Sequence, residues 1–192
     1  DQKIAIIGAG PAGLSCAFYL AEKGYKPIVF EKNERPGGML TYGIPSFKLQ
    51  KDVIEAEVEI IRLMGAEFRY GVEVGRDVTL DELLEKSDFI SLHAPALPGG
   101  PLVNADTIAK MKDGVCIINT SRGGNVDEKA LLEALNSGKV RAAGLDVWAE
   151  EPSKNHDLYS HPMVSCTPHI GAQTVEAQKR IGAEIVEIIS KM

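Results

Sequence analysis

Three glycines near the start of the chain are spaced in a way that can bind phosphate groups. Gly8, Gly10 and Gly13 follow a short apolar run and open a stretch with helical periodicity. The first glycine permits a tight turn out of a strand, the second leaves room for a pyrophosphate, and the third lets the helix pack closely. The unpaired amides at the helix start, around Pro11 and Ala12, would face the phosphates. The spacing therefore predicts a dinucleotide cradle.

An acidic residue at the end of the next apolar run supports this prediction. Glu31 lies 18 residues after Gly13, near the spacing of about 20 at which a carboxylate accepts hydrogen bonds from a ribose diol. A carboxylate there repels a ribose 2′-phosphate, so we expect NAD or FAD rather than NADP, although Lys32 and Arg35 bring positive charge nearby. The alternative is a tight turn between strand and helix that binds nothing.

Short apolar, β-branched runs alternate with amphipathic stretches along the chain, which is typical of βα units around a parallel sheet. We expect seven strands, at residues 4–7, 27–30, 67–70, 88–93, 115–120, 142–147 and 164–167. We expect six helices, at residues 12–23, 52–64, 80–86, 105–111, 128–137 and 174–191. Segments 32–51 and 94–104 are rich in Gly and Pro and should be loops. The pattern predicts an α/β fold, a three-layer doubly wound (Rossmann) parallel sheet in one domain, 1–192.

The ends of several predicted helices carry their own signals. Gly24, Gly65 and Gly138 each follow a helical stretch and are expected to close it in the left-handed conformation. In the last predicted helix, apolar residues recur every four positions and should pack on the sheet. These residues are Ala177, Ile181, Ile185 and Ile189.

Composition narrows the classes of partner. The 192 residues include 21 Lys and Arg against 27 Asp and Glu, a net charge of −6. Without a basic stripe, binding to nucleic acid or to an anionic membrane surface is not expected. No apolar run is long enough for a membrane helix and no signal-peptide pattern opens the chain, so we expect a cytoplasmic protein. Widely spaced Cys16, Cys116 and Cys166 predict buried free thiols, with no disulfide and no metal site.

Five motifs in the first part of the chain occur in a recognisable order. They are Gly-Ala-Gly-Pro-Ala-Gly-Leu at 8–14, Phe-Glu-Lys at 30–32, Pro-Gly-Gly-Met-Leu at 36–40, Tyr-Gly-Ile-Pro at 42–45 and Gly-Val-Glu-Val-Gly at 71–75. From about residue 3 to 84 the chain resembles the FAD- and NAD(P)H-dependent oxidoreductases of the glutamate synthase small-subunit type. That resemblance implies an FAD site with the Pro-Gly-Gly stretch near the flavin pyrophosphate. The later Ala-Thr-Gly strand and the distal Gly-Asp pair of such proteins are missing.

A second set of motifs fills the rest of the chain. It comprises Ser-Asp-Phe-Ile-Ser-Leu-His-Ala-Pro at 87–95, Met-Lys-Asp-Gly at 111–114, Ile-Asn-Thr-Ser-Arg-Gly-Gly at 118–124, Val-Asp-Glu at 126–128, Ala-Gly-Leu-Asp-Val at 143–147, Glu-Pro at 151–152 and Thr-Pro-His-Ile-Gly-Ala at 167–172. From about residue 83 to 186 the chain thus resembles the NAD-binding domain of the D-2-hydroxyacid dehydrogenases, most closely the D-3-phosphoglycerate dehydrogenase branch.

The second resemblance implies a set of catalytic residues. By analogy with that family, Arg122 would bind the substrate carboxylate and keto oxygen, His169 would move the hydroxyl proton, and Glu151 would orient the imidazole. These residue types suit the tasks, since a guanidinium fits a carboxylate and imidazole titrates near neutrality. The resemblance also implies cofactor contacts, with Asp146 helping to hold the nicotinamide amide. The other contacts of this set are Ala94, Pro95, Thr120, Ser121 and His169.

Each of these residues also has a plain structural interpretation. Arg122 could be a solvated loop residue, Glu150 and Glu151 could be surface charges, and His169 could brace a turn after Pro168. We choose Glu151 over Glu150 because it precedes a proline, as in the family pattern.

Two families in one chain suggest an engineered chimera, with an abrupt switch between Thr79 and Asp88. We expect residues 1–84 and 85–192 to share one sheet and to bind a dinucleotide, NAD being favoured and FAD the alternative cofactor. The second domain that closes over the cofactor in such dehydrogenases is missing here, so we expect little or no turnover. An active D-2-hydroxyacid dehydrogenase and a non-binding scaffold are the alternatives. A homodimer is a further expectation, because related dehydrogenases pair through this domain.

Overall fold

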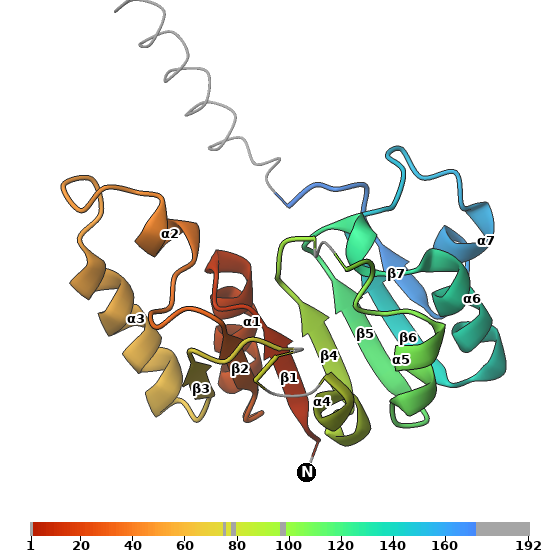
Figure 1. Ribbon diagram of the computed structural model, residues 1–192, viewed down its shortest axis with the longest axis horizontal. Helices are drawn as coiled ribbons and strands as arrows, with labels where there is room; N and C mark the ends of the chain where they lie inside the picture. Colours follow the sequence, from red (N-terminus) through yellow and green to blue (C-terminus); the bar gives the residue numbers. More distant parts are fainter. Residues whose placement is uncertain (1, 75, 78–79, 97–98, 172–192) are drawn as a thin grey trace, which may run out of the picture.

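A seven-stranded parallel sheet forms the centre of the molecule (Figure 1). The computed structural model describes residues 2–74, 76–77, 80–96 and 99–171. In the sheet the strands follow the order β3-β2-β1-β4-β5-β6-β7. Their bounds are β1 Ile4–Ile7, β2 Ile28–Glu31, β3 Glu67–Tyr70, β4 Phe89–Leu92, β5 Val115–Asn119, β6 Val140–Leu145 and β7 Val164–Cys166. This confirms the predicted fold class and all seven predicted strands.

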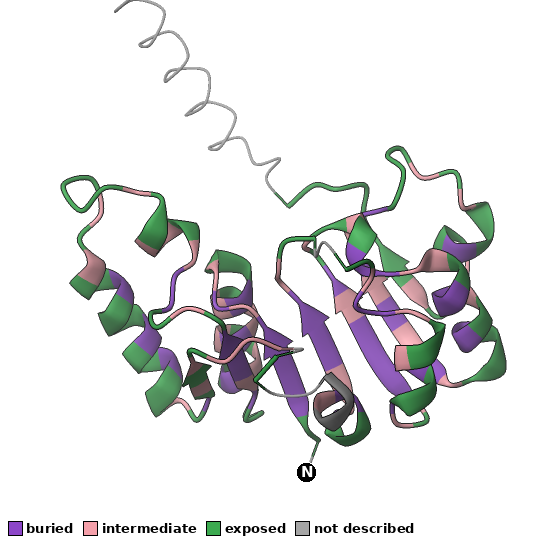
Figure 2. Ribbon diagram, in the orientation of Figure 1, coloured by how far each residue is buried: buried purple, intermediate pink, exposed green. Residues whose placement is uncertain are grey.

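Helices cover both faces of this sheet, which gives the three predicted layers. On one face α1 packs against α3, and on the other α4 packs against α5, and α5 against α6. The helices are α1 Pro11–Glu22, α2 Met39–Tyr42, α3 Lys51–Leu63, α4 Leu80–Lys86, α5 Ala105–Lys110, α6 Glu128–Ser137 and α7 His156–Tyr159, with a 3-10 turn at Gly123–Asn125. Separate hydrophobic clusters lie under the two helical layers. Figure 2 shows the buried residues concentrated in the strands and on the inner sides of the helices.

The two parts of the chain meet in the middle of the sheet. Strand β1, from the first part, pairs with β2 on one side and with β4, from the second part, on the other. Ile6, for example, lies opposite both Val29 and Ser91. The loops that follow β1 and β4 therefore leave the same edge of the sheet side by side. In doubly wound sheets this switch point is where ligands bind.

Local signals in the sequence explain where the helices of the second part begin. The Asp127 carboxylate accepts hydrogen bonds from the amides of Lys129 and Ala130 at the start of α6. Asn104 and Thr107 form a reciprocal capping box at the start of α5. Such caps satisfy amides that would otherwise lack a partner. The predicted closing glycines, Gly24, Gly65 and Gly138, all have positive φ.

The structure corrects several local predictions. The predicted loop 32–51 contains helix α2, and α7 and the 3-10 turn were not predicted at all. These elements are only three or four residues long, too short for a periodic pattern to show. Strand β6 begins at Val140, two residues earlier than expected, because the left-handed Gly138 ends α6 and the chain enters the sheet at once. The predicted helix at 174–191 lies outside the described residues.

The three cysteines are free thiols, but only one is buried. Cys116 is buried and Cys16 is partly buried, whereas Cys166 is exposed. The prediction of a buried thiol was wrong for Cys166, because β7 is the outermost strand and its last two residues are exposed. Among the described helices, none combines the length and the apolar character that a bilayer crossing requires.

Candidate functional site

The loop between β1 and α1 has the geometry of a phosphate cradle. Gly8 adopts φ +106°, and a Cβ there would lie 2.7 Å from the carbonyl oxygen of His93. A Cβ at Gly13 would lie 2.0 Å from the Gly8 carbonyl oxygen, so the close approach of α1 to the loop requires glycine. At Gly10 no heavy atom lies within 4 Å of the Cβ position. The protein leaves that space open, as the pyrophosphate interpretation of Gly10 requires.

Glu31, at the end of β2, is tied to this loop by hydrogen bonds. Its carboxylate is buried and accepts the Ala9 amide at 2.8 Å, the Asn33 amide at 2.9 Å and the Asn33 side-chain amide at 2.7 Å. Because a carboxylate offers about four acceptor positions, it can take a further hydroxyl donor. Glu31 therefore holds the cradle in shape and can still meet a ribose.

A cavity of about 640 Å³ opens at this place, and both parts of the chain line it. Its volume lies in the range of about 300–1,000 Å³ that is usual for small-molecule and cofactor sites. Gly8, Gly10 and Glu31 come from the first part. The second part contributes His93, Ala94, Pro95 and Leu102. A ligand in this cavity would therefore touch the seam between the two segments.

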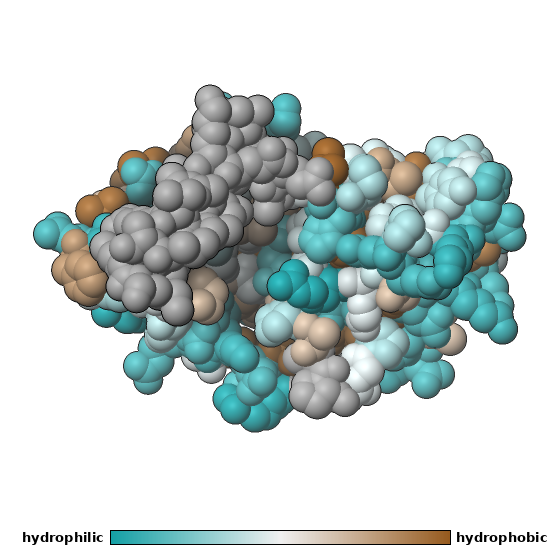
Figure 3. All heavy atoms as spheres, turned by 90° about the horizontal axis from the view of Figure 1, so that it is seen from above, coloured by the Kyte–Doolittle hydropathy of each residue, from teal (hydrophilic) through white to brown (hydrophobic). Residues whose placement is uncertain are grey.

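The Pro-Gly-Gly stretch forms a wall of the cradle. The Gly37 amide donates to the Ala9 carbonyl at 2.8 Å, and a Cβ at Gly38 would lie 3.0 Å from the Gly10 Cα. Helix α2 continues this wall, with Met39 lining the cavity. Figure 3 shows brown, hydrophobic atoms at the left end of the upper face, the side of α2 and α3. Met39 is also one of the most exposed large hydrophobic residues among those that the structure describes.

His93 closes the cavity on the β4 side and is hydrogen-bonded through both ring nitrogens. Its Nε2 lies 2.7 Å from Ser91 Oγ and its Nδ1 lies 3.2 Å from Thr120 Oγ1. Burial lowers the pKa of His93 from 6.5 to about 4, so the ring is neutral at physiological pH. On the far side of Ser91, burial raises the pKa of the Cys16 thiol, outweighing the hydrogen bond to Ser91. The cradle therefore contains a neutral histidine at the point where β1 and β4 meet.

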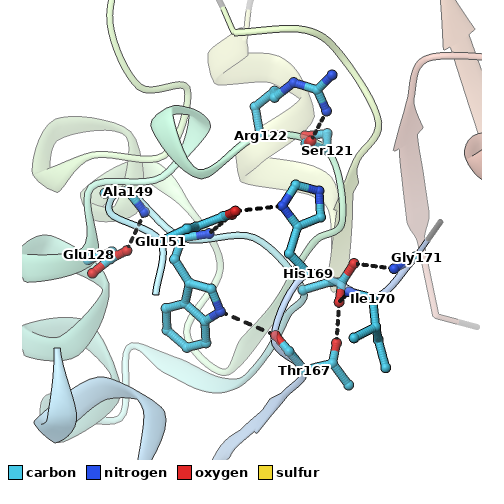
Figure 4. Close-up of polar contacts among 11 residues, drawn as sticks. Ser121, Arg122, Glu128, Ala149, Glu151, Thr167, His169, Ile170 and Gly171 are labelled. Atoms are coloured by element: carbon cyan, nitrogen blue, oxygen red, sulfur yellow. Dashed lines mark hydrogen bonds and ion pairs between the residues drawn. The ribbon is translucent and has the colours of Figure 1, made fainter. Parts of the chain in front are cut away.

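Glu151 and His169 form a second group, at the β6 and β7 end of the sheet. Glu151 Oε2 and His169 Nδ1 are 2.7 Å apart, and the Trp148 amide also donates to Glu151 at 3.2 Å (Figure 4). The hydrogen bond with His169, followed by that from Trp148, lowers the pKa of Glu151. With Nδ1 engaged by the carboxylate, the other ring nitrogen is the one that can exchange a proton with a ligand.

The pair borders a separate cavity of about 430 Å³. Aromatic and proline side chains supply much of its wall, together with the exposed thiol of Cys166. Trp148 and Tyr159 meet edge to face. No residue lines both cavities. The cofactor candidates and the proton-transfer candidates therefore occupy distinct places at the sheet edge.

Asp146, after β6, fixes the turn that carries His169. Its carboxylate accepts the Thr167 hydroxyl and the amides of Ile170, at 3.0 Å, and Gly171, at 3.2 Å. Burial raises the pKa of Asp146, but these hydrogen bonds outweigh it and the net shift is downward. His169 lies inside this turn with φ +55°, an unusual conformation for a residue other than glycine. The Asp146 contacts hold the imidazole in that strained position.

Arg122 lies in the turn after β5, close to the loop that carries Glu151. A Cβ at the next residue, Gly123, would lie 1.9 Å from the Trp148 carbonyl oxygen, which shows how tightly turn and loop pack. The Arg122 guanidinium donates to the Ser121 carbonyl at 2.7 Å (Figure 4). Within the described residues it pairs with no carboxylate. The guanidinium is therefore exposed and available for an anion.

The structure sorts the predicted site residues into three groups. The cavity of the cradle is lined by Gly8, Gly10, Pro11, Glu31, Lys32, Ala94 and Pro95. The second cavity is bordered by Glu151 and His169. The residues that line neither are Ala12, Gly13, Thr120, Ser121, Arg122 and Asp146.

Two residues that the sequence did not single out connect these groups. The buried Asn125 donates through Nδ2 to the Ala94 carbonyl at 2.9 Å and to the Ser121 hydroxyl at 3.0 Å. Glu128 accepts the Ala149 amide at 2.7 Å and the Asn155 side chain at 2.9 Å, which fixes the loop of Glu151. The bonds to Ala94, Ala149 and Asn155 span 21 to 31 residues of sequence, so no local pattern could reveal them.

Two family models match consecutive parts of the chain. Residues 63–171 match the D-isomer specific 2-hydroxyacid dehydrogenase, NAD binding domain. Residues 6–62 match the NAD(P)-binding Rossmann-like domain. The position of the join, which we expected between Thr79 and Asp88, stays a prediction.

Curated relatives divide in the same way. The chain is 54% identical over 118 residues to the hydroxypyruvate reductase of Thermotoga maritima, a match that covers 59% of this chain and 39% of that protein. It is 53% identical over 92 residues to the glutamate synthase [NADPH] small chain of Halomonas elongata, which covers 48% of this chain and 20% of the relative. The chain thus spans only a fifth to two fifths of these relatives.

Solved structures of similar fold extend over nearly the whole chain. D-lactate dehydrogenase from Aquifex aeolicus, solved with NAD and lactic acid, has a TM-score of 0.70 at 29% identity, covering 98% of this chain and 52% of that one. A glyoxylate reductase from Paecilomyes thermophila has a TM-score of 0.69 at 32% identity, covering 95% and 46%. The likeness includes the first part of the chain, whose own sequence resembles another family.

Proposed function

Because the chain belongs to the D-isomer specific 2-hydroxyacid dehydrogenase NAD-binding domain family over more than half of its length, we propose that it binds NAD(H) with little or no turnover. The observation that carries the proposal is the single cavity lined jointly by the glycine loop and by residues 93–95. NAD supplies a hydride acceptor, and its reduced form a hydride donor. The chain's own residues bind and orient the dinucleotide.

The cradle fits the adenosine diphosphate end of the cofactor. The open space at Gly10 leaves room for the pyrophosphate, and the first amides of α1 offer donors to it. Glu31, held by Ala9 and Asn33, keeps acceptor capacity for the ribose hydroxyls. By analogy with the family, Thr120, Ser121 and Asp146 would serve the nicotinamide end.

FAD remains the alternative cofactor. The Pro-Gly-Gly wall comes from a segment homologous to the glutamate synthase small chains, and the adenine end of the cavity would suit either dinucleotide. The residues after β4 and β5 favour NAD, because they belong to the segment that matches an NAD-binding family. We expect the purified chain to carry no flavin colour.

A titration tests the binding proposal directly. We expect NADH fluorescence to saturate with the unaltered chain, and Gly10→Val to weaken that binding about tenfold or more by filling the pyrophosphate space. Glu31→Arg should also weaken it. Gly99→Val is the matched control, since Gly99 also has open space at its Cβ position but does not line the cavity. A chain that binds neither NADH nor flavin would be a folded scaffold only.

A second candidate function is D-2-hydroxyacid dehydrogenase activity. It is favoured by the hydrogen bond between Glu151 and His169, because a carboxylate paired with an imidazole is an arrangement that can move a proton during reduction of a keto group. Arg122, after β5, would bind the substrate carboxylate. We expect weak turnover at most, because the Arg122 guanidinium is held by one backbone carbonyl and the His169 side chain is close to half exposed.

The activity test is the loss of NADH absorbance with small 2-ketoacids. We expect a rate close to background, and any rate above it should vanish in Arg122→Ala. Lys154→Ala is a matched control, because Lys154 also has an exposed cation near this loop but pairs with Glu150. A rate unaffected by Arg122→Ala would assign the turnover to another site.

The organisation of the chain is proposed on the same grounds. We infer that residues 1–84 and 85–192 form one domain, which the pairing of β1 with β4 supports. An engineered fusion would explain the change of family within one sheet. Homodimer formation and a cytoplasmic location are further proposals, the first testable by analytical ultracentrifugation.

A further inference from the structure

The turn after β2 holds two cations that could recognise a 2′-phosphate on the adenosine ribose, the group that distinguishes NADP from NAD. Lys32 lines the cavity beside Glu31. Arg35 follows three residues later and does not line it. Its backbone amide nevertheless donates at 3.1 Å to the hydroxyl of Tyr42, whose side chain does line the cavity. The backbone of Arg35 is thus anchored to a residue that lines the cavity.

A carboxylate of helix α3 holds the Arg35 guanidinium outside the cavity. Arg35 Nε lies 2.9 Å from Glu55 Oε1, and its terminal nitrogen Nη2 pairs with the same oxygen. Glu55 lies in the second turn of α3 and does not line the cavity. Both side chains are about half exposed. The pair is therefore accessible, and water screens it.

We propose that Glu55 is a specificity-determining residue, which restrains Arg35 and thereby favours a dinucleotide without a 2′-phosphate. The proposal rests on NAD(H) binding at the cradle. An Arg near the acidic residue that ends β2 is a recognised way of accommodating a 2′-phosphate. With Glu55 in place, that Arg is already paired with a carboxylate and the nearest anion to the ribose is Glu31.

The magnitude of the effect follows from the exposure of the pair. An exposed ion pair holds its partners weakly, so removing the Glu55 carboxylate should free Arg35 for a phosphate dianion with only a modest gain in affinity. We expect Glu55→Gln to tighten NADPH binding about fivefold, since the amide keeps the size of the side chain but loses the charge. NADH binding should stay unchanged, because NADH carries no group for Arg35 to bind.

Fluorescence titrations of NADH and NADPH with the full chain test this. Glu59→Gln is the matched control, because Glu59 lies on the same helix, is equally exposed and pairs with Arg62 at 2.8 Å away from the cavity. The double variant Glu55→Gln/Arg35→Ala should lose the gain. An unchanged NADPH to NADH ratio in Glu55→Gln would overturn the proposal, and so would a gain that survives in the double variant.

The outcome is separable from that of the proposed function. An unaltered chain that binds NADH while Glu55→Gln leaves the ratio unchanged overturns the role of Glu55 alone. An unaltered chain that binds neither NADH nor NADPH overturns both.

Discussion

The cradle after β1 and the Glu151–His169 pair near β7 differ in what holds them. In the cradle, backbone positions and buried hydrogen bonds set the geometry, as the Gly8 and Gly13 approaches and the buried Glu31 show. Around the pair, two half-exposed side chains share one hydrogen bond with each other, and among the described residues the Arg122 guanidinium is bonded to its own turn. Binding geometry built from backbone is therefore part of the fold itself. Proton-transfer geometry built from exposed side chains is not fixed by the fold in this way.

This difference explains how a join between two families can keep a cofactor cradle. Both segments place loops at the carboxyl edge of a parallel sheet, so pairing β1 with β4 is enough to bring residues 8–13 next to residues 93–95. Precise placement of Arg122 against His169 needs more than sheet pairing, because orientation of reacting groups tolerates little error. We therefore expect binding to be more robust than turnover.

The largest expected effect tests whether backbone packing fixes the cradle. Gly13→Ala should lower the free energy of unfolding by roughly 3 kcal/mol, because its Cβ would overlap the Gly8 carbonyl oxygen. Gly10→Ala should change it by less than about 0.5 kcal/mol, since nothing lies near its Cβ position. Urea denaturation of the two variants measures the difference. Equal stabilities would show that α1 does not pack on the loop as described.

The second effect uses the neutral histidine of the cradle. Burial lowers the pKa of His93 from 6.5 to about 4. Between these pH values the unfolded chain binds a proton at His93 that the folded chain does not bind. Stability contributed by this group is present above pH 6.5 and is lost as the pH falls to about 4. The loss should amount to roughly 3 kcal/mol.

Denaturation curves across this pH range, for the unaltered chain and His93→Gln, isolate the contribution. The variant should lose less stability between pH 6.5 and 4, and the difference between the two profiles is the share of His93. Ser165→Ala, on the exposed edge strand β7, serves as the control for a substitution without a titrating group. Parallel profiles for His93→Gln and the unaltered chain would mean that His93 titrates normally.

The sequence allowed the cradle to be predicted better than the pair, for a physical reason. Gly8, Gly10, Gly13 and Glu31 act through local turns and strand ends, whose requirements are written in residue type and spacing. The hydrogen bond from Asn125 to the Ala94 carbonyl, in contrast, joins positions 31 residues apart in the chain. Such partners depend on which strands become neighbours and on side-chain rotamers, and neither follows from spacing.

The fold divides in the same way between predictable and unpredictable elements. Alternating apolar and amphipathic segments were enough to predict the strands of the sheet and the longer of the described helices. They did not reveal α2 or α7, which are single turns stabilised by their surroundings, or the exposure of Cys166, which depends on β7 lying at the edge. Family resemblance identified Arg122, Glu151 and His169, but whether the three act together depends on contacts that resemblance does not supply.

A third, smaller effect tests the connection between the two regions. Asn125→Ala should cost about 2 kcal/mol of stability, because it leaves the Ala94 carbonyl and the Ser121 hydroxyl without a buried donor. It should also weaken NADH binding, since Ala94 lines the cradle. Asn136→Ala, at an exposed position in α6, is the control for removal of an amide. An unchanged affinity for NADH in Asn125→Ala would show that Asn125 does not couple the cradle to the turn after β5.

The smallest expected effect concerns the exposed pair itself. The pKa of Glu151 is lowered chiefly by its hydrogen bond to His169, so His169→Ala should raise that pKa toward its usual value. A lowered carboxyl pKa stabilises the fold above the ordinary pKa of a glutamate, and this stabilisation is lost as the pH falls through the lower, folded value. Both groups are too exposed for denaturation to resolve the change, so carboxyl carbon NMR titration is the appropriate measurement.

His156→Ala provides the matched comparison, because His156, at the start of α7, is hydrogen-bonded to Ser160 and does not contribute to the lowered pKa of Glu151. That variant should leave the Glu151 titration where it is. If His169→Ala also left it unchanged, the Trp148 amide would be the group that lowers the pKa of the carboxylate. The contrast between the regions would then be sharper still, with a cradle fixed by the fold and no assembled proton-transfer site beside it.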